Sequence, residues 1–381
     1  MKNRILINAL GIVDSGGLST FKKLLTECVL DNNNSYYIIC NEGVFTNPLK
    51  KKYLNSRTME FKFIANKGFF HRIYYENFIF RTIIKKKNIG LVYNFTGTAQ
   101  PFIKALQLIK IQNLLFFSKS LDSSYIQQKK YFLWTRQIFF KRLIFRMMLQ
   151  KSKYIEIQSE HTKSCLSDFI NITNKVFNVK SDISLSDSEL SLPRHYDFTK
   201  KITFLYIVGP HFEYLHKNLR DFTNAMLGIS NKDLDFEINI TLTIEQLNNS
   251  KVWDASLNSK TNFLGYIDDQ EKMTELFCDN TILISTSVIE TLGLHVIEGI
   301  KNGVITIVPD EKYANTVYGK NMFKYNLFDK DSLINTIMTL INFKMSYREK
   351  IFSIQDDLRQ NEIGKFTNIL DVFDEVINVQ K

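Results

Sequence analysis

One stretch of the sequence, residues 285–310, strongly restricts the folds open to this chain. An apolar run, Thr281–Ser285, leads into it, a glycine-containing turn and a short helical pattern follow, and a second apolar run occupies Val304–Val308. Strand, turn, helix and strand in this order predict a βαβ unit with parallel strands. Glu290 lies in the turn and Glu298 in the helix, with seven residues between them. Open α/β sheets bind ligands at the carboxyl ends of their strands, so this turn is a candidate binding site.

The same alternation of strands and helices runs along most of the chain. The predicted strands are residues 4–12, 36–40, 61–65, 89–94, 108–112, 154–158, 202–208, 236–243, 261–264 and 281–285. The predicted helices are residues 18–30, 71–87, 125–151, 163–170, 218–227, 244–249 and 270–278. A chain of 381 residues exceeds what one core usually supports. We therefore predict two α/β domains whose parallel sheets face each other across a cleft.

Charge is distributed unevenly and indicates where the domains meet. Residues 1–180 contain 29 Lys and Arg against 10 Asp and Glu, whereas residues 181–381 contain 20 against 29, which gives +19 and −9. The change of sign falls in a polar stretch, Lys180–Ser188. We predict a first domain at 1–185, a second at 186–360, and a C-terminal helix in 361–381 that packs back on the first domain. The basic first domain favours an anionic partner.

Cysteine usage and hydropathy exclude several classes of protein. The four cysteines, Cys28, Cys40, Cys165 and Cys278, show no CxxC pair and no metal-ligand spacing, which is typical of free thiols in a reducing compartment. No stretch reaches the roughly 18 uncharged apolar residues of a spanning helix. The apolar start of the chain runs into Asp14–Ser19 without a cleavage site, so it reads as a strand rather than a signal peptide. A cytoplasmic location is the expectation.

Five short motifs occur in a fixed order along the chain. They are Gly16-Gly17 before a helix, Ile157–Lys163, Phe204–Gly209 with His216-Lys217-Asn218 after it, Phe263–Ile267, and the Glu290/Glu298 pair. Together they resemble glycosyltransferase family 4 of the GT-B architecture, as found among enzymes of bacterial polysaccharide and O-antigen synthesis. The resemblance implies two Rossmann-like domains that hold a nucleotide-diphosphate sugar between them.

The resemblance assigns a role in donor binding to a set of residues. Backbone N–H groups at helix N-termini suit phosphates and glycine lets them approach closely, which fits Gly16, Gly17 and Leu292-Gly293-Leu294. Lys217 would offset charge on the leaving diphosphate. A carboxylate accepts two hydroxyl hydrogen bonds, which suits Glu298 to the ribose and Glu290 to the transferred sugar. Gly209, Gly265 and Tyr266 complete the predicted donor site, with Gly265 and Tyr266 at the base.

The chain departs from the family pattern at two places. Many members carry a histidine near the transferred sugar, where this sequence has Gln112-Asn113. Neither side chain is a base at neutral pH, but Asn113 can hydrogen-bond a sugar oxygen and is the third predicted catalytic residue, with Glu290 and Lys217. The usual arginine after the first strand of the second domain is replaced by Pro210-His211. Participation of His211 or His295 is left open.

By resemblance, transfer retains the anomeric configuration, through same-face attack with the leaving phosphate accepting the proton. No cofactor and no metal are expected, since there is no DxD-like cluster and Asp268-Asp269 reads as a helix cap. The expected acceptor is a glycan or a lipid-linked oligosaccharide. The segment Lys129–Arg146 mixes six cations with large aromatics. It predicts either contact with an anionic membrane surface, on the inner face of the cytoplasmic membrane, or a partly buried scaffold helix.

Three other functions remain open. The basic first half of the chain is compatible with a nucleic-acid-binding protein. The sequence shows neither an RNP-like nor a helix-turn-helix signature, however, so no nucleic-acid partner is expected. A sugar-nucleotide epimerase of GT-B fold and a degenerate member that binds without catalysis would both share the motifs. Gln112-Asn113 and Pro210 lend these two some support. The sequence does not specify the donor sugar, its base, or the linkage formed.

Overall fold

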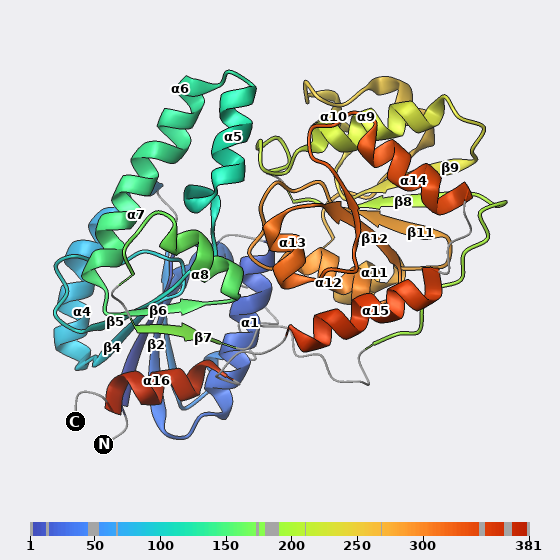
Figure 1. The fold of residues 1–381 in the computed structure, drawn as a ribbon. Helices are drawn as coiled ribbons and strands as arrows, with labels where there is room; N and C mark the ends of the chain where they lie inside the picture. Colours follow the sequence, from blue (N-terminus) through green and yellow to red (C-terminus); the bar gives the residue numbers. More distant parts are fainter. Residues whose placement is uncertain are drawn as a thin grey trace. The chain divides into compact units, whose positions relative to one another are not determined.

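The computed structural model describes residues 3–12, 15–44, 53–65, 68–172, 175–179, 190–209, 211–267, 269–342, 347–361 and 368–378. The chain divides into two compact units. Unit 1 comprises Met1–Phe117, Phe132–Ile183 and Ile363–Lys381, and unit 2 comprises Ser118–Tyr131 and Ser184–Glu362. Each unit is an α/β sandwich around a parallel sheet (Figure 1). The prediction of two parallel-sheet α/β domains is confirmed.

Unit 1 contains a seven-stranded parallel sheet of order β3-β2-β1-β4-β5-β6-β7. Its strands are β1 (Asn3–Ala9), β2 (Asn34–Asn41), β3 (Met59–Ile64), β4 (Leu91–Asn94), β5 (Leu106–Lys110), β6 (Tyr154–Ile157) and β7 (Lys175–Asn178). The central strands are buried on both faces, and their β-branched and aromatic side chains favour this environment.

Unit 1 contains a set of helices, several of which cover the two faces of its sheet. They are α1 (Ser15–Leu30), α3 (Phe69–Tyr74), the π-helix η2 (Tyr75–Ile79), α4 (Phe80–Lys87), α6 (Tyr131–Trp134), the π-helix η4 (Thr135–Phe139), α7 (Phe140–Lys151), α8 (Glu160–Ser167) and α16 (Ile369–Asn378), with 3-10 turns η1 (Glu42–Val44) and η3 (Leu115–Phe117). Helices α1 and α16 share one core cluster with β1, β2 and β4, and α4 packs in a second cluster. The C-terminal helix α16 therefore belongs to unit 1, where Phe373 packs edge-on against Tyr93 with ring centroids 5.0 Å apart.

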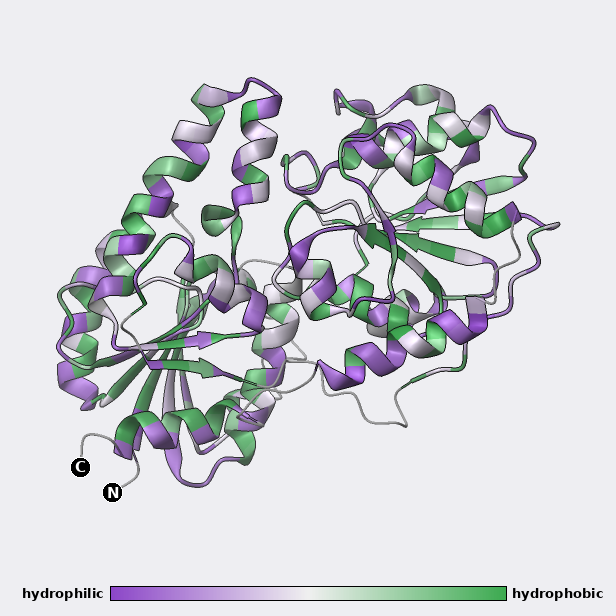
Figure 2. Cartoon of the chain, viewed as in Figure 1, coloured by the Kyte–Doolittle hydropathy of each residue, from purple (hydrophilic) through white to green (hydrophobic). Residues whose placement is uncertain are grey.

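Unit 2 contains a six-stranded parallel sheet of order β10-β9-β8-β11-β12-β13. Its strands are β8 (Ile202–Tyr206), β9 (Phe236–Ile240), β10 (Thr261–Phe263), β11 (Thr281–Ile284), β12 (Ile305–Pro309) and β13 (Phe323–Tyr325). Its helices are α5 (Lys119–Gln127), α9 (Leu219–Ser230), α10 (Ile244–Asn248), α11 (Gln270–Glu275), α12 (Leu294–Lys301), α13 (Lys312–Val317), α14 (Ser332–Asn342) and α15 (Tyr347–Gln360), with the 3-10 helix η6 (Ala255–Lys260). Figure 2 shows the strands of the sheets as predominantly hydrophobic, with hydrophilic residues along the surrounding helices.

The structure corrects the predicted helix over 125–151. Helix α5 ends at Gln127 and a new helix starts at Tyr131, because Lys129 adopts a left-handed conformation with φ 55°. Residues 118–131 also group with unit 2, where the Ser120 hydroxyl donates a 2.8 Å hydrogen bond to Glu311. A single boundary at residue 185 therefore does not describe the division of the chain. The edge strands β7 and β13 were not predicted.

No helix in the described ranges combines the length and the apolar character needed to cross a membrane. Polar or charged residues recur within every long helix, including the 16-residue α1.

Candidate functional site

The strand order of unit 2 creates a switch point between β8 and β11. From β8 the chain proceeds outward to β9 and β10, and it then returns to β11 and proceeds outward the other way. The loops that follow β8 and β11 consequently diverge, and such a point is where open α/β sheets bind ligands. Lys217 lies in the loop after β8 and Glu290 in the loop after β11.

Lys217 and Glu290 meet at this switch point. The Lys217 ammonium donates a 2.6 Å hydrogen bond to Glu290 Oε1, and the two side chains are 24% and 15% exposed. The backbone of the two loops is also joined: the Val288 amide donates to the His216 carbonyl at 2.7 Å, and the Thr286 hydroxyl donates to the Lys217 carbonyl at 2.9 Å. The structure thus brings together two of the three predicted catalytic residues.

Electrostatics keep this centre in a defined charge state. Burial alone would raise the pKa of Glu290, but the charge of Lys217 and its hydrogen bond lower it to about 2. Burial, with the charge of Lys217, lowers the pKa of His216 to about 3. Burial also lowers the pKa of His295 to about 4, against the opposing effect of Glu290. Near neutral pH the site therefore holds one carboxylate and two uncharged imidazoles, and the His295 Nε2 lies 3.1 Å from the Ser285 hydroxyl.

A glycine turn lies directly beside this ion pair. Gly293 precedes α12 in the left-handed region with φ 59°, a conformation that costs L-residues with a side chain roughly 1–2 kcal/mol. A Cβ at this position would lie 2.0 Å from the Tyr318 hydroxyl and 3.4 Å from Glu290 Cγ. The Tyr318 hydroxyl is buried and has no hydrogen-bond partner in the described part of the chain. Buried hydroxyls are normally paired, so this group is a candidate ligand contact.

The other predicted donor residues of unit 2 follow the carboxyl ends of its strands. Gly209 follows β8, and Gly265 follows β10 with φ 67°. Next to it, Tyr266 is 58% exposed. Since all strands of the sheet are parallel, these residues lie at the same edge as Glu290.

Residues around the glycine turn differ in burial. Leu292 is buried, Leu294 is half-buried, and Glu298 is half-buried within α12. The structure therefore places the whole set predicted for the second domain at one edge of one sheet or in the helix that begins there.

The predicted residues of unit 1 lie at the corresponding edge of its own sheet. Gly16 and Gly17 are in the first turn of α1, after β1, and a Cβ at Gly17 would meet no atom within 4 Å. The Asn113 side chain accepts a 2.8 Å hydrogen bond from the Leu115 amide and so shapes the turn after β5. His211, left open by the sequence, stacks on Tyr214 in unit 2 with ring centroids 5.2 Å apart. Pro210 lies outside the described residues.

A polar network at the switch point of unit 1 was not anticipated from the sequence. The buried Glu76 accepts hydrogen bonds of 2.9 Å from both Asn8 and Arg72, and Arg72 also donates to Thr96 at 2.8 Å. Glu76 lies in the π-helix η2, a type of turn that is often found at functional sites. No local motif marks these residues, because β1, η2 and the loop after β4 meet only in the folded unit.

The described residues contain no group of three or more His, Cys, Asp or Glu side chains arranged to hold a metal ion. Asp269 caps α11, where its carboxylate accepts a 2.9 Å hydrogen bond from the Glu271 amide. Its neighbour Asp268 lies outside the described residues.

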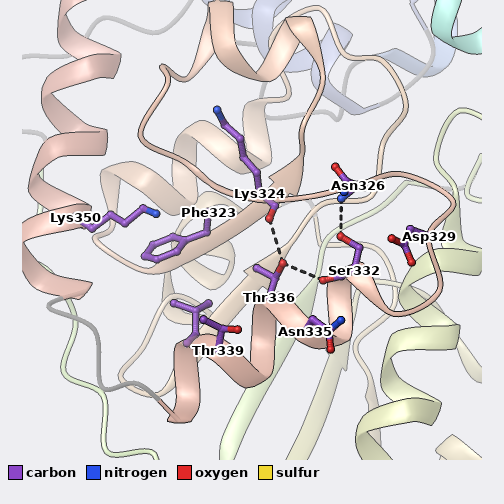
Figure 3. A pocket seen from close by; sticks show the side chains of 10 residues that line it. Phe323, Lys324, Asn326, Asp329, Ser332, Asn335, Thr336, Thr339 and Lys350 are labelled. Atoms are coloured by element: carbon purple, nitrogen blue, oxygen red, sulfur yellow. Dashed lines mark hydrogen bonds between the residues drawn. The ribbon is translucent and has the colours of Figure 1, made fainter.

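A hollow of about 460 Å³ lies elsewhere in unit 2, between β13, α14 and α15 (Figure 3). Its hydroxyls are used locally: Thr336 donates to the Lys324 carbonyl at 3.1 Å, and Ser332 accepts from the Asn326 amide at 2.8 Å. The Lys350 ammonium lies 4.3 Å from the centroid of the Phe323 ring. None of the residues predicted from sequence lines this hollow.

The two uncharged histidines at the switch point predict a loss of stability in acid. An unfolded chain protonates His295 near its ordinary pKa of 6.5, whereas the folded chain does so only near 4. Protonation therefore favours the unfolded state in this window, and His295 alone should cost about 1–2 kcal/mol of the free energy of unfolding between pH 7 and 5. Urea unfolding at both pH values should show a smaller loss for His295→Gln than for the wild type. Equal losses would contradict the burial of an uncharged imidazole.

Comparisons with solved structures find the same fold. A glycosyltransferase from Rickettsia africae matches over 99% of this chain and 99% of its own, with TM-score 0.61 and 17% identity. Sucrose-phosphate synthase from Thermosynechococcus elongatus matches over 99% and 100%, with TM-score 0.68 and 12% identity. HepE from Anabaena, in complex with UDP and glucose, matches over 99% of both chains, with TM-score 0.61 and 11% identity. No family model and no curated protein sequence matches the chain. At these identities the likeness shows the fold, which is that of GT-B glycosyltransferase structures.

Proposed function

We propose that this chain is a glycosyltransferase that takes its sugar from a nucleotide-diphosphate donor. The observation that carries the proposal is the Lys217–Glu290 pair at the switch point of unit 2, beside the Gly293 turn and the unpartnered Tyr318 hydroxyl. The fold shared with glycosyltransferases, one of them in complex with UDP and glucose, supports it.

The donor would use the groups at this edge as follows. The Lys217 ammonium and the N–H groups of the Gly293 turn face the diphosphate, since a cation and free amides at a helix N-terminus both favour anions. Glu290 accepts hydrogen bonds from the transferred sugar, and Glu298 from the ribose. Gly265 and Tyr266 line the base, and Gly209 completes the donor site. In unit 1, Gly16, Gly17 and Asn113 stay predictions for the diphosphate and the sugar.

The transfer is proposed to retain the anomeric configuration, as in glycosyltransferase family 4. The bond between the anomeric carbon and the phosphate oxygen breaks, and the electron pair leaves with the nucleoside diphosphate. An acceptor hydroxyl attacks from the same face, and its proton passes to the departing phosphate oxygen. A carboxylate whose pKa is held near 2 is a weak base at neutral pH, so Glu290 fits a sugar-binding and charge-stabilising role better than proton abstraction.

The acceptor is proposed to be a glycan or a lipid-linked oligosaccharide of cell-surface polysaccharide synthesis, such as O-antigen or capsule. The chain would then act in the cytoplasm, at the inner face of the membrane. The family resemblance described above motivates this assignment, and acceptor trials with lipid-linked oligosaccharides would test it separately from donor use.

Donor use can be tested directly. Purified full-length protein is titrated calorimetrically with UDP and GDP, and then incubated with a panel of UDP- and GDP-sugars while release of the nucleoside diphosphate is followed. We expect one nucleotide to bind and one donor to be turned over. Binding without turnover of any donor would identify a non-catalytic binding protein. Interconversion of the sugar without transfer would identify an epimerase, and failure to bind either nucleotide would overturn the proposal.

Tyr318→Phe is expected to weaken donor binding about tenfold or more, because a hydrogen bond to a charged group contributes about 1.5–3 kcal/mol. Stability should not fall, since the hydroxyl has no protein partner among the described residues. Tyr325→Phe is the matched control. The Tyr325 hydroxyl is also buried and without a partner among the described residues, but Tyr325 belongs to the edge strand β13. Calorimetry with the bound nucleotide and thermal unfolding measure both effects. Equal affinity in both variants would exclude a donor contact for Tyr318.

A further inference from the structure

The helical segment α6–η4–α7 in unit 1 presents large apolar side chains to solvent. The exposed ones in residues 132–151 are Phe132, Phe139, Phe140, Leu143, Ile144 and Met147, and Phe132 is 78% exposed. Contiguous exposed apolar surface of this kind marks a site for a partner or a membrane. In Figure 2 the segment carries hydrophobic residues along its whole length, interrupted by hydrophilic ones.

The opposite side of the segment is already packed on unit 1. Ile138 and Leu149 are buried, and Phe145 packs on Phe116 with ring centroids 4.9 Å apart. The Arg142 guanidinium donates to the Phe116 carbonyl and lies 4.3 Å from the Phe169 ring centroid. The segment is therefore anchored along one side, and its other side exposes apolar side chains together with cations.

Four of the six exposed apolar residues share one face. Phe132, Phe140, Leu143 and Met147 follow one another at intervals of eight, three and four residues, which places them on one side of a helix. Arg136 and Arg146, both exposed, lie on or beside this face. A stripe of aromatic and aliphatic side chains bordered by cations is the composition of helices that lie in the interfacial region of a membrane.

Charge decides which partner fits. Residues 123–155 contain no Asp or Glu but eight Lys and Arg, at 129, 130, 136, 141, 142, 146, 151 and 153. A second copy of the chain would bring two basic faces together, and like charges oppose such a contact. Anionic lipid headgroups match the cations, while the acyl region accepts the apolar side chains. A lipid surface therefore satisfies both the cations and the apolar side chains of this face at once.

We infer that the outward face of α6–α7 docks on an anionic lipid bilayer. The apolar side chains of Phe132 and Phe140 enter the boundary between headgroups and acyl chains, and Arg136 and Arg146 lie at the phosphates. This inference does not depend on the donor chemistry in unit 2. It would keep the protein at the surface where a lipid-linked acceptor resides.

Vesicle flotation with full-length protein tests the docking face. Vesicles of phosphatidylcholine with 30% phosphatidylglycerol, a fraction of roughly physiological anionic charge, are compared with pure phosphatidylcholine. The wild type should float only with the anionic vesicles. Two double variants should each reduce vesicle binding about tenfold or more: Phe132→Gln/Phe140→Gln and Arg136→Gln/Arg146→Gln.

Matched controls come from unit 2. Phe352→Gln removes an exposed phenylalanine on α15, and Lys272→Gln/Arg348→Gln removes two exposed cations, and both should bind vesicles as the wild type does. In a Trp253→Phe background, Trp134 on α6 reports docking by a blue shift of its emission. No binding by the wild type, or equal loss in the controls, would overturn the inference. A dimer that depends on Phe132 and Phe140, seen by sedimentation without vesicle binding, would assign the face to a second copy instead.

Discussion

Glu290→Gln is expected to lower kcat/KM for the donor by about 10²–10³-fold, the range found when one preorganised electrostatic contact is removed from an active site. Glutamine keeps the shape and a carbonyl acceptor for Lys217, so the loops after β8 and β11 should stay joined through the His216 and Lys217 carbonyls. The substitution removes the negative charge of Glu290. In the wild type the ion pair with Lys217 keeps this carboxylate charged by lowering its pKa to about 2. Steady-state release of the nucleoside diphosphate measures the effect, with thermal unfolding as a check on the fold.

Glu298→Gln separates binding from chemistry. Glu298 lies within α12, eight residues after Glu290 in the sequence, and is proposed to contact the ribose rather than the reacting sugar. Its loss should raise KM for the donor and leave kcat nearly unchanged, because it removes binding that is equal in the ground and transition states. A drop in kcat of equal size in both variants would show that the two carboxylates do not have distinct roles.

Much of the local structure around the candidate site in unit 2 could be predicted because its signals are local. The apolar runs that became β11 and β12 are buried throughout, and the glycine between them is needed for the left-handed turn before α12. Parallel pairing then brings the ends of β8, β10 and β11 to one edge of the sheet, so Gly209, Gly265 and Glu290 all follow strands at that edge.

Other features depend on distant parts of the chain and leave no local signal. The Lys217–Glu290 contact joins residues 73 positions apart, and it arises from the strand order β8-β11. The break after α5 occurs at Lys129, in a sequence without glycine or proline, so helical periodicity favoured one continuous helix. Docking of the Ser118–Tyr131 segment on unit 2 rests on tertiary contacts such as Ser120 to Glu311, which no periodicity encodes.

Gly293→Ala should both destabilise unit 2 and disturb the candidate site. Alanine at φ 59° costs about 1–2 kcal/mol of backbone strain. Its Cβ would also lie 2.0 Å from the hydroxyl of Tyr318, which is fully buried and cannot move aside freely. Overpacking of this kind typically costs a further 1–3 kcal/mol, about the same again. Urea unfolding should show the combined loss, and calorimetry should show loss of donor binding, because the displaced turn no longer presents its amides.

Two variants separate strain from collision. Gly265→Ala introduces the same left-handed strain at φ 67°, but its Cβ would lie 3.6 Å from Thr243, so only the backbone cost should appear. Gly293→Ala/Tyr318→Phe deletes the colliding hydroxyl and leaves the ring carbon 3.3 Å from the new Cβ, so part of the lost stability should return. Donor binding should not return with it, since the double variant still lacks the Tyr318 hydroxyl and keeps a strained turn. If donor binding returned together with stability, the donor would need the turn but no hydrogen bond from the Tyr318 hydroxyl.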